Sequence, residues 1–494
     1  LETRIEAFLD VVEAYRRQGA AGAKTLSPLP DAHPYTPART TLKNGRPAVI
    51  TSAGETIPMA DPRVQVLIPS MGRYSSEAFA AVFRSEGIDA RALPPADEAA
   101  LKLGRANTTC KECLPLQLTT GGLLHYLQNE APPDRVIVYF MATASGPCRF
   151  GQYRTFMEEL VKNREIPDVA LFSLSGENAY SGMRSDFSTR GWWAVIVSDV
   201  IEDIRSMILA NARDPRGGLD ILERVWNDLL FELEYGSYPD LEAALERSAA
   251  RLAEIPQKLP PEEVPVIALT GEIFVRRDSL SRRFLTEELA AKGFAVACAP
   301  VAEWLHYCDF LYQHGYCPSR ASIPELPGFL LKKMFMARYE RRIKSILATS
   351  GLVHAAPLDV EAILDNAGPY IQPHLTCETI LTVGSALTEI VSHVCGVIAI
   401  GPFGCMPNRL AEALLTKTMV KEAKLRTDPG NDLLRATLSG FEDLPFLAIE
   451  TDGSPFPQLI NAKLETSYLR ADRLHQEMPM ARFNSDHHHL YQDI

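Results

Sequence analysis

The sequence predicts two α/β domains, each built on a doubly wound parallel sheet of the flavodoxin- or Rossmann-like kind. Apolar runs of strand length alternate with amphipathic helical segments, and this alternation occurs twice along the chain. A linker rich in Pro and Glu at residues 255–263 separates the two series, and we place the main domain boundary there. A chain of 494 residues is long enough for two or three such domains.

The composition narrows the class of protein. Hydrophobic residues make up 46% of the chain and charged residues 23%, as in an ordinary globular protein. The formal net charge of -12 gives no general affinity for nucleic acid or anionic lipid. No apolar run reaches the roughly 18 residues of a membrane span, and no basic region followed by an apolar core opens the chain. We therefore expect a cytoplasmic protein without nucleic-acid or membrane partners.

Residues 1–60 are expected to form an N-terminal extension and linker. Residues 1–17 have a helical pattern, and residues 27–46 are rich in Pro and Thr, which is typical of a linker. Residues 22–25 faintly resemble a phosphate loop. The pattern lacks a Gly directly before its Lys and no strand precedes it, so we reject this interpretation.

The first α/β domain, with its helical segment, is predicted over residues 61–262. The expected strands are residues 64–69, 88–93, 135–141 and 169–173. The expected helices are residues 75–85, 119–129 and 150–162, followed by a mostly helical insertion over residues 191–254. Because functional loops in parallel sheets follow the carboxyl ends of the strands, the turn after residues 135–141 is a candidate site.

The second α/β domain is predicted over residues 263–480, and residues 481–494 are expected to be a tail. The expected strands are residues 264–269, 294–299, 397–400 and 444–450. The expected helices are residues 284–292, 327–347 and 458–475. The second domain therefore repeats the strand–helix pattern of the first.

The cysteines suggest a shared site. Their number, nine, is odd, and they are scattered from Cys110 to Cys405, which does not suit a disulfide framework. Cys113, Cys148 and Cys405 lie on turns with neighbouring Pro or Gly, and Cys148 and Cys405 each follow a predicted strand. Iron–sulfur clusters need several converging thiolates. If these three cysteines hold one cluster, Cys148 and Cys405 must lie close together, between the domains and near the carboxyl ends of both sheets.

The remaining cysteines are weighed individually. Cys298 and Cys395 lie in apolar segments, and core packing is the favoured interpretation for both, as it is for Cys308. Cys377 opens a helical pattern, where the helix dipole favours a thiolate ligand. Cys317, which precedes a Pro in a loop, is either a ligand or an ordinary loop residue.

Other polar residues leave alternatives open. Cys110 and Cys113 form a C-x-x-C pair, which would also suit a zinc half-site or a redox pair, although no second pair completes a structural zinc site. Glu272 and Arg276 either line a ligand cleft or are a capping carboxylate and a solvated arginine. Arg149 would balance the charge of a cluster or hold an anion. The histidines at residues 487–489 are expected to belong to the tail rather than to a metal site.

Five stretches carry a family resemblance. The most specific is Gly-Pro-Cys-Arg-Phe-Gly-Gln-Tyr at residues 146–153. The supporting ones are residues 111–115, 271–276, 303–307 and 402–407. They resemble the dehydratase-like part of the large acyl-CoA dehydratase activase-related proteins. That family is related to the 2-hydroxyglutaryl-CoA dehydratase and benzoyl-CoA reductase subunits and to the double-cubane cluster proteins. The resemblance extends over residues 64–465.

The resemblance implies an iron–sulfur cluster at the domain interface. In the dehydratases each subunit's 4Fe–4S cubane uses three cysteines, and the matching positions here are Cys113, Cys148 and Cys405. Double-cubane relatives hold an 8Fe–9S cluster with six cysteines. The chain would supply six if three further cysteines took part, namely Cys110, Cys317 and Cys377.

The resemblance also implies an ATP-hydrolysing activator of the actin/Hsp70-like class, which donates a low-potential electron. The chain has no recognisable ATPase module, so the activator is expected as a separate chain or as a missing N-terminal part. We expect an oligomeric reductase or dehydratase component of anaerobic metabolism that reduces a small molecule or an acyl-CoA. Two alternatives remain. One is a non-catalytic scaffold subunit of a larger activase complex, stabilised by a cluster or by zinc, and the other is a cluster-free binding protein.

Overall fold

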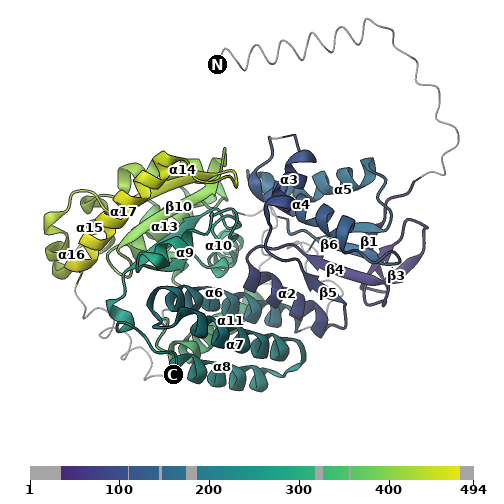
Figure 1. Ribbon diagram of the computed structural model, residues 1–494, viewed down its shortest axis with the longest axis horizontal. Helices are drawn as coiled ribbons and strands as arrows, with labels where there is room; N and C mark the ends of the chain where they lie inside the picture. Colours follow the sequence, from purple (N-terminus) through teal and green to yellow (C-terminus); the bar gives the residue numbers. More distant parts are fainter. Residues whose placement is uncertain are drawn as a thin grey trace, which may run out of the picture.

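The computed structural model describes residues 35–109, 111–143, 147–173, 186–316, 326–354 and 358–478. Two four-stranded parallel sheets and one three-stranded antiparallel sheet organise these residues. Figure 1 shows the first parallel sheet on the right, in purple and blue, and the second on the left, in green. The prediction of two doubly wound α/β domains is confirmed.

The first parallel sheet has the strand order β5-β4-β6-β7. Its strands are β4 (Val64–Ile68), β5 (Ala90–Ala92), β6 (Val136–Phe140) and β7 (Val169–Phe172). Its main covering helices are α2 (Arg73–Ser85), α4 (Leu114–Asn129), α5 (Tyr153–Asn163) and α6 (Phe187–Asn211). Val66 and Val138 pack in the cluster that contains α2 and α6, whereas Leu67 and Tyr139 pack in the cluster that contains α4 and α5. Successive strand residues therefore bury opposite faces of the sheet.

The second parallel sheet has the strand order β11-β10-β8-β9. Its strands are β8 (Val266–Gly271), β9 (Ala295–Cys298), β10 (Gly396–Pro402) and β11 (Phe446–Thr451). One face packs against α9 (Leu285–Ala291) and α17 (Gln458–Glu477). The other face packs against α10 (Val301–Gln313), α13 (Thr379–Glu389) and α14 (Met406–Thr418).

The two sheets share one topology. Numbered along the chain within each domain, the strand order of both is 2-1-3-4. The second strand is added on one side of the first and the third strand on its other side, so the order in which strands are added reverses between the first and third strands. The crevice expected for a ligand therefore lies at the carboxyl ends of β4 and β6 and of β8 and β10. Cys148 follows β6 and Cys405 follows β10, so both cysteines occupy equivalent places in the two domains.

The N-terminal region differs from the sequence-based expectation. The strands β1 (Arg39–Lys43), β2 (Arg46–Ile50) and β3 (Thr56–Pro58) form an antiparallel meander. The Thr40 hydroxyl donates to the Leu171 carbonyl oxygen at 3.0 Å, which anchors the meander beside β7. The prediction of a linker over residues 27–46 is therefore wrong for residues 39–43. The helix expected at residues 1–17 lies outside the described residues.

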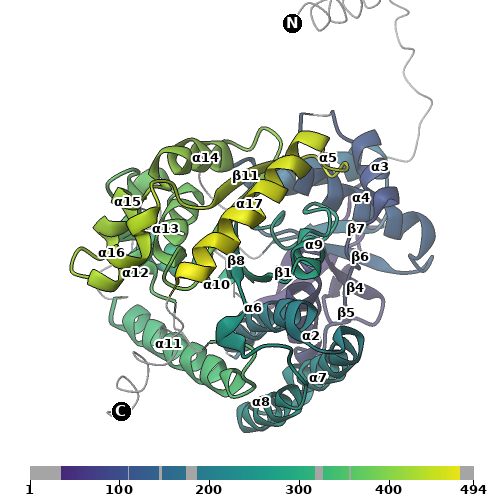
Figure 2. The same cartoon turned by 60° about the vertical axis from the view of Figure 1, so that its left-hand side comes forward.

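The remaining helices surround this core. The insertion predicted to be mostly helical over residues 191–254 contains α7 (Pro215–Tyr235) and α8 (Tyr238–Ala253), and α11 (Leu326–Ala348) packs beside α8 (Figure 2). Smaller helices are α3 (Glu98–Ala106), α12 (Val360–Ala367), α15 (Lys421–Thr427) and α16 (Asp432–Thr437). Among the described helices, none combines the length and apolar character needed to cross a membrane.

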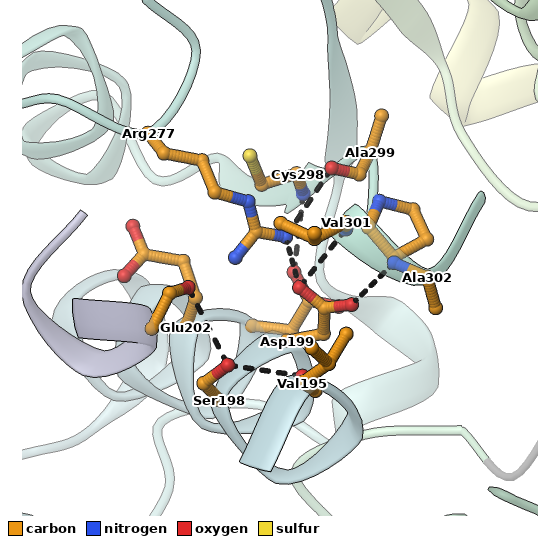
Figure 3. Close-up of polar contacts among 12 residues, drawn as sticks. Val195, Ser198, Asp199, Glu202, Arg277, Cys298, Ala299, Val301 and Ala302 are labelled. Atoms are coloured by element: carbon orange, nitrogen blue, oxygen red, sulfur yellow. Dashed lines mark hydrogen bonds and ion pairs between the residues drawn. The ribbon is translucent and has the colours of Figure 1, made fainter. Parts of the chain in front are cut away.

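Helix α6 joins the two domains through side-chain acceptors. The Asp199 carboxylate accepts the backbone N–H groups of Val301 and Ala302, each at 3.1 Å, and forms an ion pair with Arg277 at 2.6 Å (Figure 3). One and two turns further on, Asp203 accepts from the N–H of Cys298, and Ser206 from that of Val296. These bonds occupy the outer edge of β9, which would otherwise present unpaired backbone groups.

Candidate functional site

The carboxyl ends of the two sheets meet across a tight contact. Gly72 follows β4 with a φ of 94°, and a Cβ atom there would lie 3.1 Å from the Cβ atom of Arg277, which follows β8. A small apolar cluster beside this contact contains residues from both domains, including Leu101, Leu118 and Phe274. The loops that carry the candidate site residues are therefore held against one another.

The structure brings together the thiols of Cys113, Cys148 and Cys405. Cys113 is the N-cap residue of α4, Cys148 that of the 3₁₀ turn η1 (Arg149–Gln152), and Cys405 that of α14. The Cys113 thiol raises the pKa of Cys148, and the Cys148 thiol raises the pKa of Cys405. No disulfide joins them. Two thiols of the first domain and one of the second thus lie within electrostatic reach of one another in two successive pairs.

Two opposing effects act on these thiols. Loss of hydration is the largest cause of the raised pKa of each thiol, and for Cys148 it raises the pKa to about 11. The backbone N–H groups at the starts of the following helices lower all three pKa values, although none makes a full capping hydrogen bond. Helix N-termini favour thiolates, and a bound cation that replaces the protons would relieve the cost of burial.

Two carboxyl groups, those of Glu272 and Glu378, act electrostatically on the candidate thiols. Glu272 directly follows β8, and its charge raises the pKa of all three thiols, while Glu378 raises those of Cys148 and Cys405. The Glu378 carboxylate accepts the Ile273 N–H at 3.1 Å, and burial together with the Glu272 charge raises its own pKa. Sequence reasoning missed Glu378. Its only signal was its position next to Cys377.

Glu272 and Arg276 lie in the loop after β8, and their contacts show whether each lines the cleft, caps a turn or lies in solvent. The Glu272 carboxylate accepts the Val275 N–H at 2.9 Å, so this residue caps the local turn and also faces the thiols. Arg276 is only 3% exposed, and its guanidinium donates to the carbonyl oxygens of Gly271 and Pro300. The interpretation of Arg276 as a solvated arginine is therefore wrong. It braces the turn that holds Glu272.

Two side chains tie the Cys148 turn to the Cys113 turn. The Tyr153 hydroxyl forms a hydrogen bond with the Cys113 thiol. The Arg149 guanidinium donates to the Lys111 carbonyl oxygen at 2.6 Å and so fastens one turn to the other. Tyr153 belongs to the specific motif at residues 146–153, but no spacing rule connected its hydroxyl with Cys113.

The other candidate ligands differ in position. Cys377 is buried, and its thiol shares a hydrogen bond with the Thr379 hydroxyl at 3.1 Å. It precedes α13 as Cys113 precedes α4, so the two are topological equivalents. Cys110, Cys317 and the histidines at residues 487–489 lie outside the described residues.

The cysteines assigned to packing behave as predicted. Cys298 is 5% exposed in β9, and Cys395 is 1% exposed just before β10. The Cys395 thiol donates to the Val266 carbonyl oxygen at 3.2 Å, and burial raises its pKa to about 12. Cys308 is half-buried on α10. Core packing is thus confirmed for Cys298 and Cys395.

The spacing of the possible ligand atoms is relevant to whether a single metal ion or an iron–sulfur cluster could be held. Within the described residues, no three His, Cys, Asp or Glu side chains come close enough together to hold a metal ion. Thiolate ligands of one tetrahedral zinc ion lie only about 3.8 Å apart. Thiolates around an iron–sulfur cluster lie farther apart, because the iron–sulfide core separates them. Among the described residues, the Cys113 thiol acts on Cys148 and the Cys148 thiol on Cys405, without the close grouping that one zinc ion would require.

Comparison with known proteins adds no family assignment. A scan of protein-family models gives no match for the chain, and a search of curated proteins gives none either.

Proposed function

We propose that the chain is the iron–sulfur component of a reductase or dehydratase. In this proposal Cys113, Cys148 and Cys405 hold a cluster between the two domains, and a separate ATP-hydrolysing protein supplies low-potential electrons. The substrate is an acyl-CoA or another small molecule. The proposal follows the family resemblance of the sequence, and the geometry of the site supports it.

One observation carries the proposal. Thiols from two domains, separated by up to 292 residues of sequence (405 − 113), influence one another's protonation at the carboxyl ends of both sheets. Parallel α/β sheets bind their ligands at this edge. Unrelated cysteines have no reason to lie at three helix N-termini on this edge, within electrostatic reach of one another in two successive pairs.

The residues around the thiols suit this role. A bound cluster supplies single electrons at low potential, and the protein tunes that potential and controls access of water. The N–H groups at the three helix N-termini offset part of the thiolate charge. Glu272 and Glu378 place carboxyl groups beside the thiols, and carboxyl groups are common proton carriers in reductions.

The electron donor would approach the Cys405 turn. Phe403 is 71% exposed and Met406 44% exposed, on either side of Cys405. The Cys148 side chain also reaches solvent, although neighbouring atoms remove enough of its hydration to raise its pKa. A partner that covers these two apolar side chains would come close to the proposed cluster and would also exclude water from it.

Anaerobic purification and reconstitution test the proposal. We expect a brown protein with about four iron atoms per chain for a single cubane, or about eight for a double cubane. EPR of the reduced protein distinguishes the two. A wild-type chain that stays colourless, without iron or acid-labile sulfide, would refute the proposal.

Matched variants identify the ligands. Cys148→Ser and Cys405→Ser should each lower iron content sharply. Cys395→Ser is the control, because Cys395 is equally a cysteine of the second domain but bonds the Val266 carbonyl oxygen in the core. A cluster that forms normally but is not reduced by any ATP-driven donor would favour the scaffold interpretation instead.

A further inference from the structure

Tyr153 contacts one of the three cysteines of the candidate site. Tyr153 is the first residue of α5 and stands five positions after Cys148. It is 5% exposed, and its hydroxyl forms a hydrogen bond with the Cys113 thiol. Tyr153, which contacts the proposed ligand Cys113, thus lies close in sequence to a second proposed ligand, Cys148.

The Tyr153 ring is fixed in place. It packs edge-to-face against Phe150, with ring centroids 5.2 Å apart, and it lies in the apolar cluster beneath α4 and α5. Its hydroxyl therefore reaches Cys113 from a packed ring rather than from a mobile side chain. A rigid donor of this kind keeps its direction when the charge on its acceptor changes.

The direction of the hydrogen bond follows from the chemistry of a ligand thiolate. A thiolate has no proton, so it only accepts, and the Tyr153 hydroxyl must donate. The packed Tyr153 ring holds the hydroxyl within hydrogen-bond distance of the Cys113 sulfur, so the donor is already in place.

We infer that Tyr153 is a positioning residue that raises the reduction potential of the proposed cluster by donating a hydrogen bond to Cys113. A hydrogen bond to a ligand sulfur stabilises negative charge, and the reduced cluster carries one more negative charge than the oxidised one. The inference rests on the proposed function, and it assigns to this chain a residue that sets how easily the donor's electron is accepted.

The test compares Tyr153→Phe with wild type and with Tyr139→Phe after anaerobic reconstitution. Tyr139 is a buried tyrosine of the same domain whose hydroxyl donates to the Thr119 carbonyl oxygen at 2.8 Å, so it controls for loss of a buried hydroxyl. Midpoint potentials are measured by EPR-monitored redox titration. Iron and sulfide are counted for each protein.

We expect Tyr153→Phe to keep its cluster and to titrate at a lower potential. The reduced-to-oxidised ratio at a fixed potential should fall about tenfold, which equals about 59 mV for one electron. In wild type, ENDOR spectra should show an exchangeable proton coupled to the cluster, and Tyr153→Phe should lack it. Tyr139→Phe should match wild type in both measurements.

Other outcomes separate the two claims. A wild-type protein without iron refutes the proposed function before Tyr153 is considered. An intact cluster in Tyr153→Phe with an unchanged potential and an unchanged proton coupling overturns the inference alone. Loss of the cluster in Tyr153→Phe but not in Tyr139→Phe also overturns it, because Tyr153 would then serve assembly rather than potential.

Discussion

Cys113 is the N-cap residue of helix α4, and the packing of α4 against α3 requires a glycine at position 121 but not at position 122. α4 packs against α3, and a Cβ atom on Gly121 would lie 1.9 Å from the Ala100 carbonyl oxygen, which belongs to the backbone of α3. Ordinary contact begins near 3.4 Å, so the two helices would have to separate by about 1.5 Å (3.4 − 1.9). Overpacking of this kind costs about 1–3 kcal/mol or more, and a backbone obstacle puts Gly121→Ala at the upper end.

The adjacent Gly122 provides the matched control. A Cβ atom there would meet only the Leu93 Cδ1 atom, at 3.7 Å. Replacing a helical glycine by alanine without a clash stabilises by about 0.5–1 kcal/mol. The helical gain applies to both variants, so in urea unfolding followed by circular dichroism Gly121→Ala should be less stable than Gly122→Ala by about 3 kcal/mol. Equal stabilities, or a more stable Gly121→Ala, would refute the reasoning about the α3–α4 contact.

Three further perturbations test the domain interface and the site. Asp199→Ala leaves the buried Arg277 guanidinium without its carboxylate and should cost about 3–5 kcal/mol in urea unfolding. Asp228→Ala breaks an exposed pair with Arg251 and should cost no more than about 1 kcal/mol, and equal losses would contradict this contrast. Burial raises the pKa of Asp203 from 3.8 to about 7, so its contribution to stability should fall as pH rises from about 4 to about 7. Asp203→Asn should flatten that decline in urea midpoints, and a wild-type slope in the variant would exclude Asp203 as its source. Gly271 has a φ of 107°, and a Cβ atom there would lie 2.1 Å from the Ile400 carbonyl oxygen. Gly271→Ala should therefore push β8 away from β10 and lower both stability and iron content. An unchanged iron content would show that the Glu272 turn tolerates this shift.

Strand–helix alternation was enough to predict both sheets, because strands buried on both faces produce short continuous apolar runs. The failures have local causes. The hairpin between β1 and β2 turns at Asn44-Gly45, and both residues have positive φ. Asn-Gly is a strong signal for a two-residue hairpin turn. The stretch was nevertheless predicted to be a linker because of its Pro and Thr content. α4 begins at Leu114 rather than at residue 119, since Pro115 near a helix start favours the first turn.

The site was predictable only in part. The sequence singled out Cys113, Cys148 and Cys405 as candidates because their turns contain Pro or Gly and two of them follow strands. Glu378 and Tyr153 were not, because their relation to the thiols arises from tertiary packing across distant segments. No local pattern encodes that the residue after Cys377 will face Cys405, or that the Tyr153 hydroxyl will reach Cys113.

The shared topology explains why the site needs both domains. Each 2-1-3-4 sheet brings one cysteine turn to the end of its third strand, and neither domain alone presents all of Cys113, Cys148 and Cys405. Because the site is made of residues from both domains, its geometry depends on how firmly the interface between the domains is held. The buried Arg277–Asp199 pair and the close approach of Gly72 to Arg277 hold that interface directly behind the Glu272 turn. The polar network of α6 is therefore part of what positions the thiols, although none of its residues faces them.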